Sequence, residues 1–185
     1  MTRSLLIVDL EATCWDRPEH RPENMEIIEI GALLLNPEDS ASPREFQSFV
    51  RPARFPVLSE FCKSLTSIGQ PDVDGADPFP GVLERFLDWM GDPRGVRLAS
   101  WGNYDRKQLL QDCRLHGLRY PFPEDHFNIK TFVAERRGWK PAGVGIVLRK
   151  LRLEFEGTAH RGIDDARNIW RILSFVLAGD LRQVL

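Results

Sequence analysis

The pattern of apolar and polar positions predicts strands near the start of the chain and mostly helices after residue 58. Apolar runs of strand length predict strands at 5–8, 27–35, 46–50 and 97–100. Apolar residues at helical spacing predict helices at 58–65, 79–90, 104–116, 129–137, 144–151 and 163–178. This order predicts a mixed α/β fold, in which helices cover a sheet that begins as an antiparallel meander.

Length and charge narrow the class of protein. With 185 residues, 42% hydrophobic and 28% charged, the chain fits a single domain over residues 1–185. The formal net charge is −2 and the pI is about 6.1. A protein that grips duplex DNA through many phosphates is usually far more basic. We therefore expect any nucleic-acid partner to be short or single-stranded, with metal ions supplying part of the positive charge.

The cysteines and the apolar runs predict a cytoplasmic location. Cys14, Cys62 and Cys113 are odd in number and form no CxxC pattern, which argues against structural zinc and a secreted disulfide framework. The apolar run after Met1 is too short for a signal peptide, and no run approaches a membrane span. No membrane or protein partner is predicted. The stretch from Asp16 to Glu23, rich in proline and charge, is the best candidate for a mobile loop.

Two acids follow the first apolar run. Asp9 and Glu11 are two positions apart, so in a continuing strand their side chains point to the same face. Neighbouring carboxylates repel each other and are costly unless a cation joins them. Taken alone, the pair fits a strand that runs out into a polar turn about equally well.

A third acid opens a predicted helix. Asp105 begins the helix at 104–116, where an aspartate is commonly a cap. It shares a stripe with Leu109 and Cys113 at spacings of four, which places it toward the packed side. Taken alone, the position of Asp105 is best interpreted as a helix cap. Taken together with the other acids, it is better interpreted as a functional residue.

The segment from His160 to Asp165 is the most informative. Apolar residues form one stripe along the helix at 163–178. Asp165 lies four positions before Ile169, at the edge of this stripe, whereas Asp164 falls on the polar face. The pattern therefore selects Asp165 as the inward acid and leaves Asp164 as a solvated or capping residue. His160 lies in the turn before the helix and gains significance from these neighbours.

These pieces resemble the DEDDh exonucleases, a branch of the ribonuclease H-like superfamily. That family has an Asp-x-Glu ending the first strand, an Asp opening a middle helix, and a His followed five positions later by an Asp. The matching residues are Asp9, Glu11, Asp105, His160 and Asp165. The resemblance implies a five-stranded mixed sheet flanked by helices.

The flanking sequence resembles the histone-mRNA and small-RNA (enhanced-RNAi) exonuclease group and its short bacterial relatives. The similar stretches are 8–14, 26–31, 61–68 and 160–165, and the likeness extends from Leu5 to about Leu177. Ser67 is a departure, because the group's pattern has glycine at that position.

The resemblance implies a 3′-5′ exonuclease that hydrolyses single-stranded nucleic acid, with RNA favoured, and releases nucleoside 5′-monophosphates. Two divalent cations, Mg²⁺ or Mn²⁺, would be held by carboxylates, because oxygen ligands suit these ions. Asp9 would bridge both ions, Glu11 and Asp165 would complete the first site, and Asp105 would serve the second. His160 would be the general base, since histidine accepts protons near neutral pH.

The same resemblance implies residues that surround the terminal nucleotide. These are Ala12, Thr13, Leu65 and Thr66, with Tyr104 as a stacking residue. Ordinary packing is at least as good an interpretation of Leu65. Candidates for phosphate contact are Lys107, Arg149, Lys150 and Arg161.

Other interpretations share some of these residues. Asp9 to Thr13 also resembles the Asp-x-Asp-x-Thr of haloacid-dehalogenase-type phosphatases, although that family needs aspartate where Glu11 stands. A non-catalytic nucleic-acid-binding or regulatory module on the same fold would usually have lost a metal ligand. A DNA proofreading-type exonuclease or an oligoribonuclease would keep all five residues, and the flanking stretches speak against both.

Overall fold

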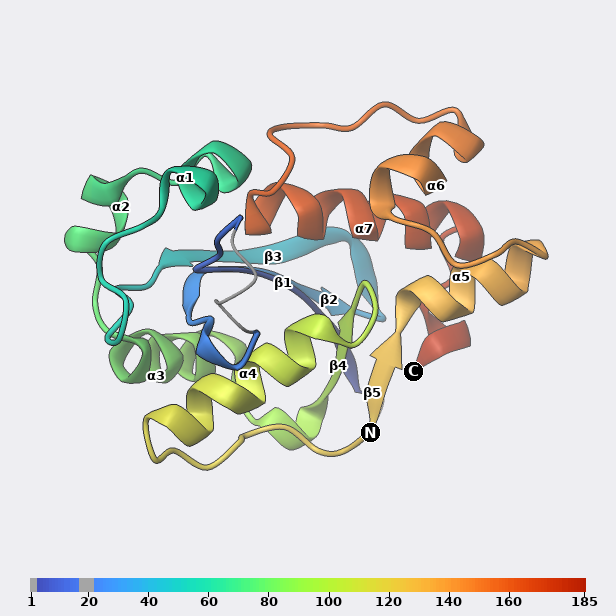
Figure 1. The fold of residues 1–185 in the computed structure, drawn as a ribbon. Coiled ribbons are helices and arrows are strands. Elements are labelled where there is room, and N and C mark those ends of the chain that lie inside the picture. Colours follow the sequence, from blue (N-terminus) through green and yellow to red (C-terminus); the bar gives the residue numbers. More distant parts are fainter. Residues whose placement is uncertain (1–2, 17–21) are drawn as a thin grey trace.

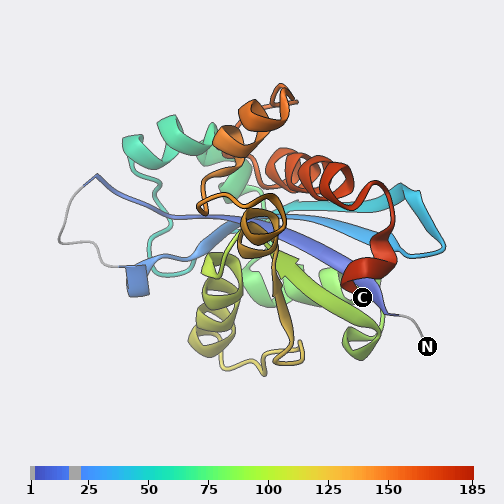
Figure 2. The same cartoon turned by 90° about the vertical axis from the view of Figure 1, so that its right-hand side faces the viewer.

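The computed structural model describes residues 3–16 and 22–185, which form a five-stranded mixed sheet with helices on both faces (Figure 1, Figure 2). The strands are β1 (Ser4–Ala12), β2 (Ile27–Asn36), β3 (Asp39–Phe49), β4 (Val96–Ser100) and β5 (His126–Asn128). Their order across the sheet is β3-β2-β1-β4-β5. The β3-β2-β1 part is antiparallel, and β4 and β5 continue parallel to β1. The predicted mixed sheet is confirmed.

The helices form one layer on each face of this sheet. They are α1 (Glu60–Thr66), α2 (Gln70–Asp74), α3 (Phe79–Met90), α4 (Tyr104–Leu115), α5 (Ile129–Arg137), α6 (Val144–Leu151) and α7 (Gly162–Leu177). Helices α3 and α4 cover one face, and α5, α6 and α7 cover the other (Figure 1). Short 3-10 turns lie at Pro22–Asn24, Pro93–Gly95 and Leu181–Val184. Within the described ranges, no helix has the length and apolar character needed to cross a membrane.

Strand β1 lies at the centre of the sheet and contributes to both cores. Leu5 and Ile7 pack into the core under α7, whereas Leu6, Val8 and Leu10 pack into the core under α3 and α4. This is the period of two expected of a strand covered on both faces. Because the alternation continues, the two positions that follow Leu5 and Ile7 on the α7 face are acids.

Strand β1 extends four residues beyond the end predicted from its apolar run. Its pairing with β4 ends at Ile7 and Ala99, whereas its pairing with β2 continues to Ala12 through an irregularity after Glu11. The run Asp9 to Ala12 is therefore held on one side only. The apolar pattern did not predict this extension, because it contains polar residues and is held by main-chain pairing to β2 that does not depend on their side chains.

The other elements differ from the prediction mainly in one strand boundary and in two short elements, while the remaining boundaries agree within two residues. β3 begins at Asp39 instead of 46, because its first half is polar and carries no apolar signal. α2 and β5 were not predicted: α2 buries one residue, Val73, and β5 is only three residues long. The loop predicted from Asp16 to Glu23 falls mostly on residues 17–21, which lie outside the described residues.

Ser67 adopts a left-handed backbone conformation at the end of α1. Its φ is 59° and its ψ is 16°, and its N–H donates to the carbonyl of Lys63. A residue with a Cβ pays about 1–2 kcal/mol for this conformation, whereas glycine does not. A glycine, which the resemblance led us to expect here, would adopt this conformation without that cost.

We expect Ser67→Gly to raise the free energy of unfolding by up to about 1 kcal/mol, because removal of the strain outweighs the added freedom of the unfolded chain. Urea unfolding measures the change. Ser59→Ala at the other end of α1 is the matched control: it removes the cap that accepts from the Cys62 N–H, and should cost about 1 kcal/mol. An unchanged or lower stability of Ser67→Gly would contradict the assignment of strain.

Candidate active site

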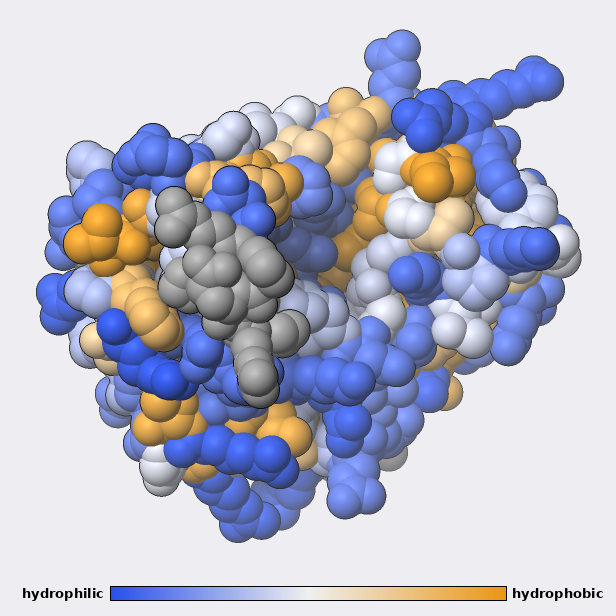
Figure 3. Space-filling view, in the orientation of Figure 1, coloured by the Kyte–Doolittle hydropathy of each residue, from blue (hydrophilic) through white to orange (hydrophobic). Residues whose placement is uncertain are grey.

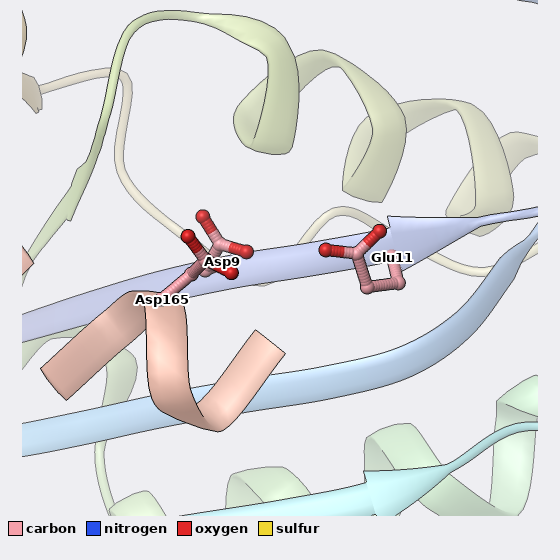
Figure 4. A group of neighbouring side chains, drawn as sticks. All are labelled: Asp9, Glu11 and Asp165. Atoms are coloured by element: carbon pink, nitrogen blue, oxygen red, sulfur yellow. The ribbon is translucent and has the colours of Figure 1, made fainter. Parts of the chain in front are cut away.

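Three carboxylates meet where β1 faces the first turn of α7. Asp9, Glu11 and Asp165 each offer an oxygen, and these oxygens lie within 4.8 Å of one another (Figure 4). Asp9 and Glu11 share the α7 face of β1, as their spacing predicted. Asp165 projects from the helix toward them, whereas Asp164 binds the Thr158 N–H and Arg167.

Asp105 approaches from the opposite side of β1. It is 6% exposed and lies in the first turn of α4. Its Oδ1 accepts the N–H of Leu10 at 3.1 Å. That N–H lies beyond the end of the β1–β4 pairing, so Asp105 takes the place of a strand partner.

All five predicted residues line one cavity of about 560 Å³. Besides Asp9, Glu11, Asp105, His160 and Asp165, its walls are largely apolar. The apolar side chains include Leu10, Ala12, Met25, Leu65, Trp101, Val144 and Phe155. Figure 3 shows the cavity as a hollow near the centre of the molecular face, between α1 and α6.

His160 stands at the exposed side of this cavity in a left-handed conformation, with a φ of 60°. Its N–H donates to Oδ2 of Asp165 at 2.7 Å. The loop before it is also tied to α7, because Asn168 binds both the N–H and the carbonyl of Glu156. Strained backbone of this kind persists where the surroundings over-determine it.

Glu29 anchors the first turn of α7. Its side chain is fully buried on β2, and its Oε2 accepts the Gly162 N–H and the Nε of Arg161, each at 3.1 Å. Arg161, the N-cap residue, makes no side-chain cap hydrogen bond of its own. A carboxylate from the sheet therefore satisfies a donor that a helix start leaves open.

Two glycines allow α7 to lie directly on the sheet. A Cβ on Gly31 would lie 2.0 Å from the carbonyl carbon of Gly162 and 2.1 Å from the nitrogen of Ile163. A Cβ on Gly162 would lie 2.9 Å from the Asp9 carbonyl oxygen. This close backbone contact brings Asp165 to Asp9.

Burial and mutual repulsion disfavour the charged forms of these acids. Burial, and then Asp105 and Asp165, raise the pKa of Asp9 well above its usual range. Burial, and then Asp165, raise the pKa of Glu11 to about 8. Burial also raises the pKa of Asp105 to about 6, and it raises the pKa of Asp165 as well.

The donor set fits divalent cations. Within the described residues, no lysine or arginine forms an ion pair with any of the four carboxylates. Carboxylate oxygens are the ligands that hard cations prefer. A bound cation would relieve the repulsion that the structure shows.

The predicted substrate-binding residues divide into two groups. Ala12, Leu65 and Tyr104 line the cavity, and the side chains of the last two are partly exposed. Thr13 and Thr66 are buried outside its lining. The Thr13 hydroxyl accepts the Glu26 N–H, and the Thr66 hydroxyl donates to the Cys62 carbonyl. Substrate contact by all five stays a prediction.

Two aromatic residues of the cavity wall were not predicted from the sequence. Trp101 follows β4 directly, and its Nε1 donates to the Ala142 carbonyl at 3.0 Å. Its place at the strand end before Asp105 was a usable signal. Phe155 lies in the irregular segment before His160, where no periodicity marks it. Arg161, considered a phosphate ligand, is paired with Glu29.

The metal-free protein should lose stability as pH rises. A carboxyl whose pKa is higher in the folded state stabilises the fold below its ordinary pKa and loses that contribution as pH passes the folded value. For Glu11 the loss falls between pH 4.5 and about 8, and for Asp105 between 3.8 and about 6. Thermal unfolding in EDTA should therefore show a midpoint that falls across this range.

In the Glu11→Gln variant, the plot of the thermal midpoint against pH should be flatter toward pH 8. Addition of Mg²⁺ to the wild type should restore its stability at the alkaline end of the range. A midpoint that rises between pH 6 and 8 without metal would contradict the burial of these charges.

Gly31→Ala should separate α7 from the sheet, because its Cβ cannot fit against the helix backbone. We expect a loss of about 3 kcal/mol in unfolding free energy and weaker Mn²⁺ binding by calorimetry. Gly95→Ala is the matched control, since a Cβ there meets nothing within 4 Å. If Gly31→Ala does not fold, Glu29→Gln tests the same contact between α7 and the sheet. Wild-type Mn²⁺ affinity in either variant would show that this contact does not position the metal ligands.

Known proteins are similar to this chain over most of its length. The RNase_T exonuclease family matches residues 6–173. Human 3′-5′ exoribonuclease 1 is 38% identical over 181 residues, covering 91% of this chain and 50% of the human protein. Human ERI1 exoribonuclease 2 is 32% identical over 186 residues, covering 89% of this chain and 27% of that protein. The chain thus spans half or less of the length of these two relatives.

Solved structures agree with the sequence comparison. The nuclease domain of 3′hExo, a DEDDh family member bound to rAMP, superposes with a TM-score of 0.88 at 35% identity, covering 96% of this chain and 92% of that chain. A 3′-exonuclease structure concerned with 3′-end recognition of a histone mRNA stem-loop superposes with a TM-score of 0.86 at 34% identity. The match covers 96% of this chain and 82% of that chain. The predicted resemblance is confirmed, and the chain belongs to the RNase_T exonuclease family, among its DEDDh members.

Proposed function

We propose that this protein is a metal-dependent 3′-5′ exonuclease that hydrolyses phosphodiester bonds of single-stranded nucleic acid and releases nucleoside 5′-monophosphates. The observation that carries the proposal is the meeting of Asp9, Glu11 and Asp165, with ligand oxygens within 4.8 Å, in a cavity that also holds Asp105 and His160. The membership of the family supports the same activity.

The chain's own acids would hold the metal. Asp9, Glu11 and Asp165 offer converging oxygens, and Asp105 lines the same cavity. The all-oxygen donor set favours Mg²⁺ or Mn²⁺ over zinc. When bound, two such ions supply neutralisation of the phosphate charge and a lower pKa for the attacking water.

His160 would take the proton of the attacking water. It lines the cavity beside Asp165 without being buried, so its imidazole can exchange protons with solvent after each cycle. The hydrogen bond from its N–H to Asp165 fixes the backbone, so the base stays next to the metal ligands.

The preference for RNA rests on the relatives. The similar human proteins are exoribonucleases, and the similar structures contain rAMP or concern a histone mRNA stem-loop. We extend this preference to the present chain, with single-stranded or short 3′ ends as substrates. The exposed parts of Leu65 and Tyr104 offer an apolar surface for the terminal nucleotide.

We also propose one exonuclease domain over residues 1–185 that works in the cytoplasm. The described residues pack around one sheet, and Cys14, Cys62 and Cys113 are free thiols, which suits a reducing compartment.

Incubation with 5′-end-labelled single-stranded RNA and DNA, in Mg²⁺ or Mn²⁺, tests the activity. We expect a ladder that shortens from the 3′ end, faster on RNA. Absence of cleavage on both substrates would favour a non-catalytic binding module, and faster cleavage of DNA would remove the RNA preference.

Two substitutions test the roles of the residues. His160→Ala should lower turnover by about 100-fold or more while calorimetry still detects metal binding. Asp9→Asn should lose both turnover and metal affinity. Asp88→Asn, at an exposed position on α3, should leave both unchanged. Wild-type turnover by His160→Ala would refute its role as the base.

A further inference from the structure

The segment from residue 136 to 153 carries positive charge without any acid. It joins the end of α5 to the end of α6 and contains Arg136, Arg137, Lys140, Arg149, Lys150 and Arg152. These are six of the chain's 25 lysines and arginines, whereas none of its 27 aspartates and glutamates falls in the segment. In a chain with a net charge of −2, this is a strong local departure. We call these six residues the α5–α6 cations.

The α5–α6 cations are exposed and lack acidic partners. None of them forms an ion pair with another residue that the structure describes. By contrast, cations elsewhere, such as Arg85 and Arg167, are paired with acids. An anionic ligand can therefore reach these cations without breaking an ion pair to a described residue, and within that part of the chain Arg136 alone among them also donates to a side-chain oxygen, Oε1 of Gln183.

Two of these cations converge on one aromatic ring. Arg137 lies 5.2 Å and Lys150 lies 4.8 Å from the centre of the Trp139 ring. They come from different helices, so the fold itself brings like charges together. Like charges repel, and a neighbouring polyanion would offset this repulsion because it attracts both cations.

The segment is continuous with the wall of the active-site cavity. Gly143, Val144 and Gly145, at the start of α6, line that cavity, and Ala142 accepts the hydrogen bond of Trp101. Lys150 lies six residues after Val144 along α6, which corresponds to a rise of about 9 Å. Figure 3, in the orientation of Figure 1, shows hydrophilic side chains projecting from the surface in the region of α6, beside the hollow.

We propose that the α5–α6 cations bind the phosphate backbone of the single strand upstream of its 3′-terminal nucleotide. The proposal rests on the proposed function, because it takes the 3′ end to lie at the carboxylates. A strand that leaves the cavity past the start of α6 would run along the segment that carries Lys140, Arg149 and Lys150. A positively charged surface beside the acidic metal site would also explain how a protein with a net charge near zero can bind a polyanionic substrate.

The test uses the triple variant Lys140→Gln/Arg149→Gln/Lys150→Gln. Its matched control is Arg94→Gln/Arg114→Gln/Arg119→Gln, which removes the same charge from exposed positions outside the segment. Fluorescence anisotropy would follow binding of labelled RNA trimers, hexamers and dodecamers over a range of salt concentrations. EDTA is present throughout, so that no cleavage occurs and binding is measured independently of activity.

We expect the wild type to bind longer strands more tightly, and the triple variant to lose most of this gain. The slope of log affinity against log salt should fall by about 2 for the dodecamer, since each lost phosphate contact contributes roughly 0.7. The control should keep the wild-type slope. Arg149→Glu alone should weaken dodecamer binding further than Arg149→Gln, and thermal unfolding would verify that each variant is folded.

The surface is ruled out if the triple variant keeps the wild-type slope, if the control loses as much, or if the wild type binds no strand. Tighter binding of the wild type to anionic phospholipid vesicles than to RNA would also overturn it. Failure of the proposed function is distinct: the slope would then change as expected, while no 3′ ladder forms in Mg²⁺ or Mn²⁺.

Discussion

The contact between the backbone of α7 and strand β2 determines the geometry of the site. Gly31 and Gly162 let the two backbones touch, and the buried Glu29 binds the first N–H of the helix. A larger residue at either glycine would lift the helix by more than the tolerance of a metal site. The helix in turn positions Asp165 directly and His160 through its N–H. One packing contact thus fixes two of the five predicted residues.

The remaining acids are held against their electrostatic preference. Asp9 and Glu11 follow the apolar positions of β1 on the same face, and the two cores hold that strand in place. Asp105 is held by the Leu10 N–H at the point where β4 stops. Packing energy therefore keeps together carboxylates that would separate in a free chain. The repulsion between these carboxylates favours the binding of a divalent cation, because the bound cation removes it.

The sequence allowed the prediction of those features that repeat or that match the family pattern. The alternation in β1 predicted that Asp9 and Glu11 share a face, and the α7 stripe distinguished Asp165 from Asp164. Glu29 was not singled out, although an acid inside an apolar strand was a visible signal. Phe155 and the pairing of Arg161 could not be predicted, because both depend on how an irregular loop folds back. The polar half of β3 was missed because main-chain hydrogen bonds hold it.

The loop that carries His160 is tied to α7 at three successive points. Asn168 holds Glu156, Asp164 holds Thr158, and Asp165 holds His160 itself. We therefore expect the loop and the first turns of the helix to open together, because each of these hydrogen bonds joins one to the other. A fluctuation that released the base would then also disturb a metal ligand. The protein should consequently pass from competent to incompetent in a single step, with no populated state that keeps its metal site intact but has lost its base.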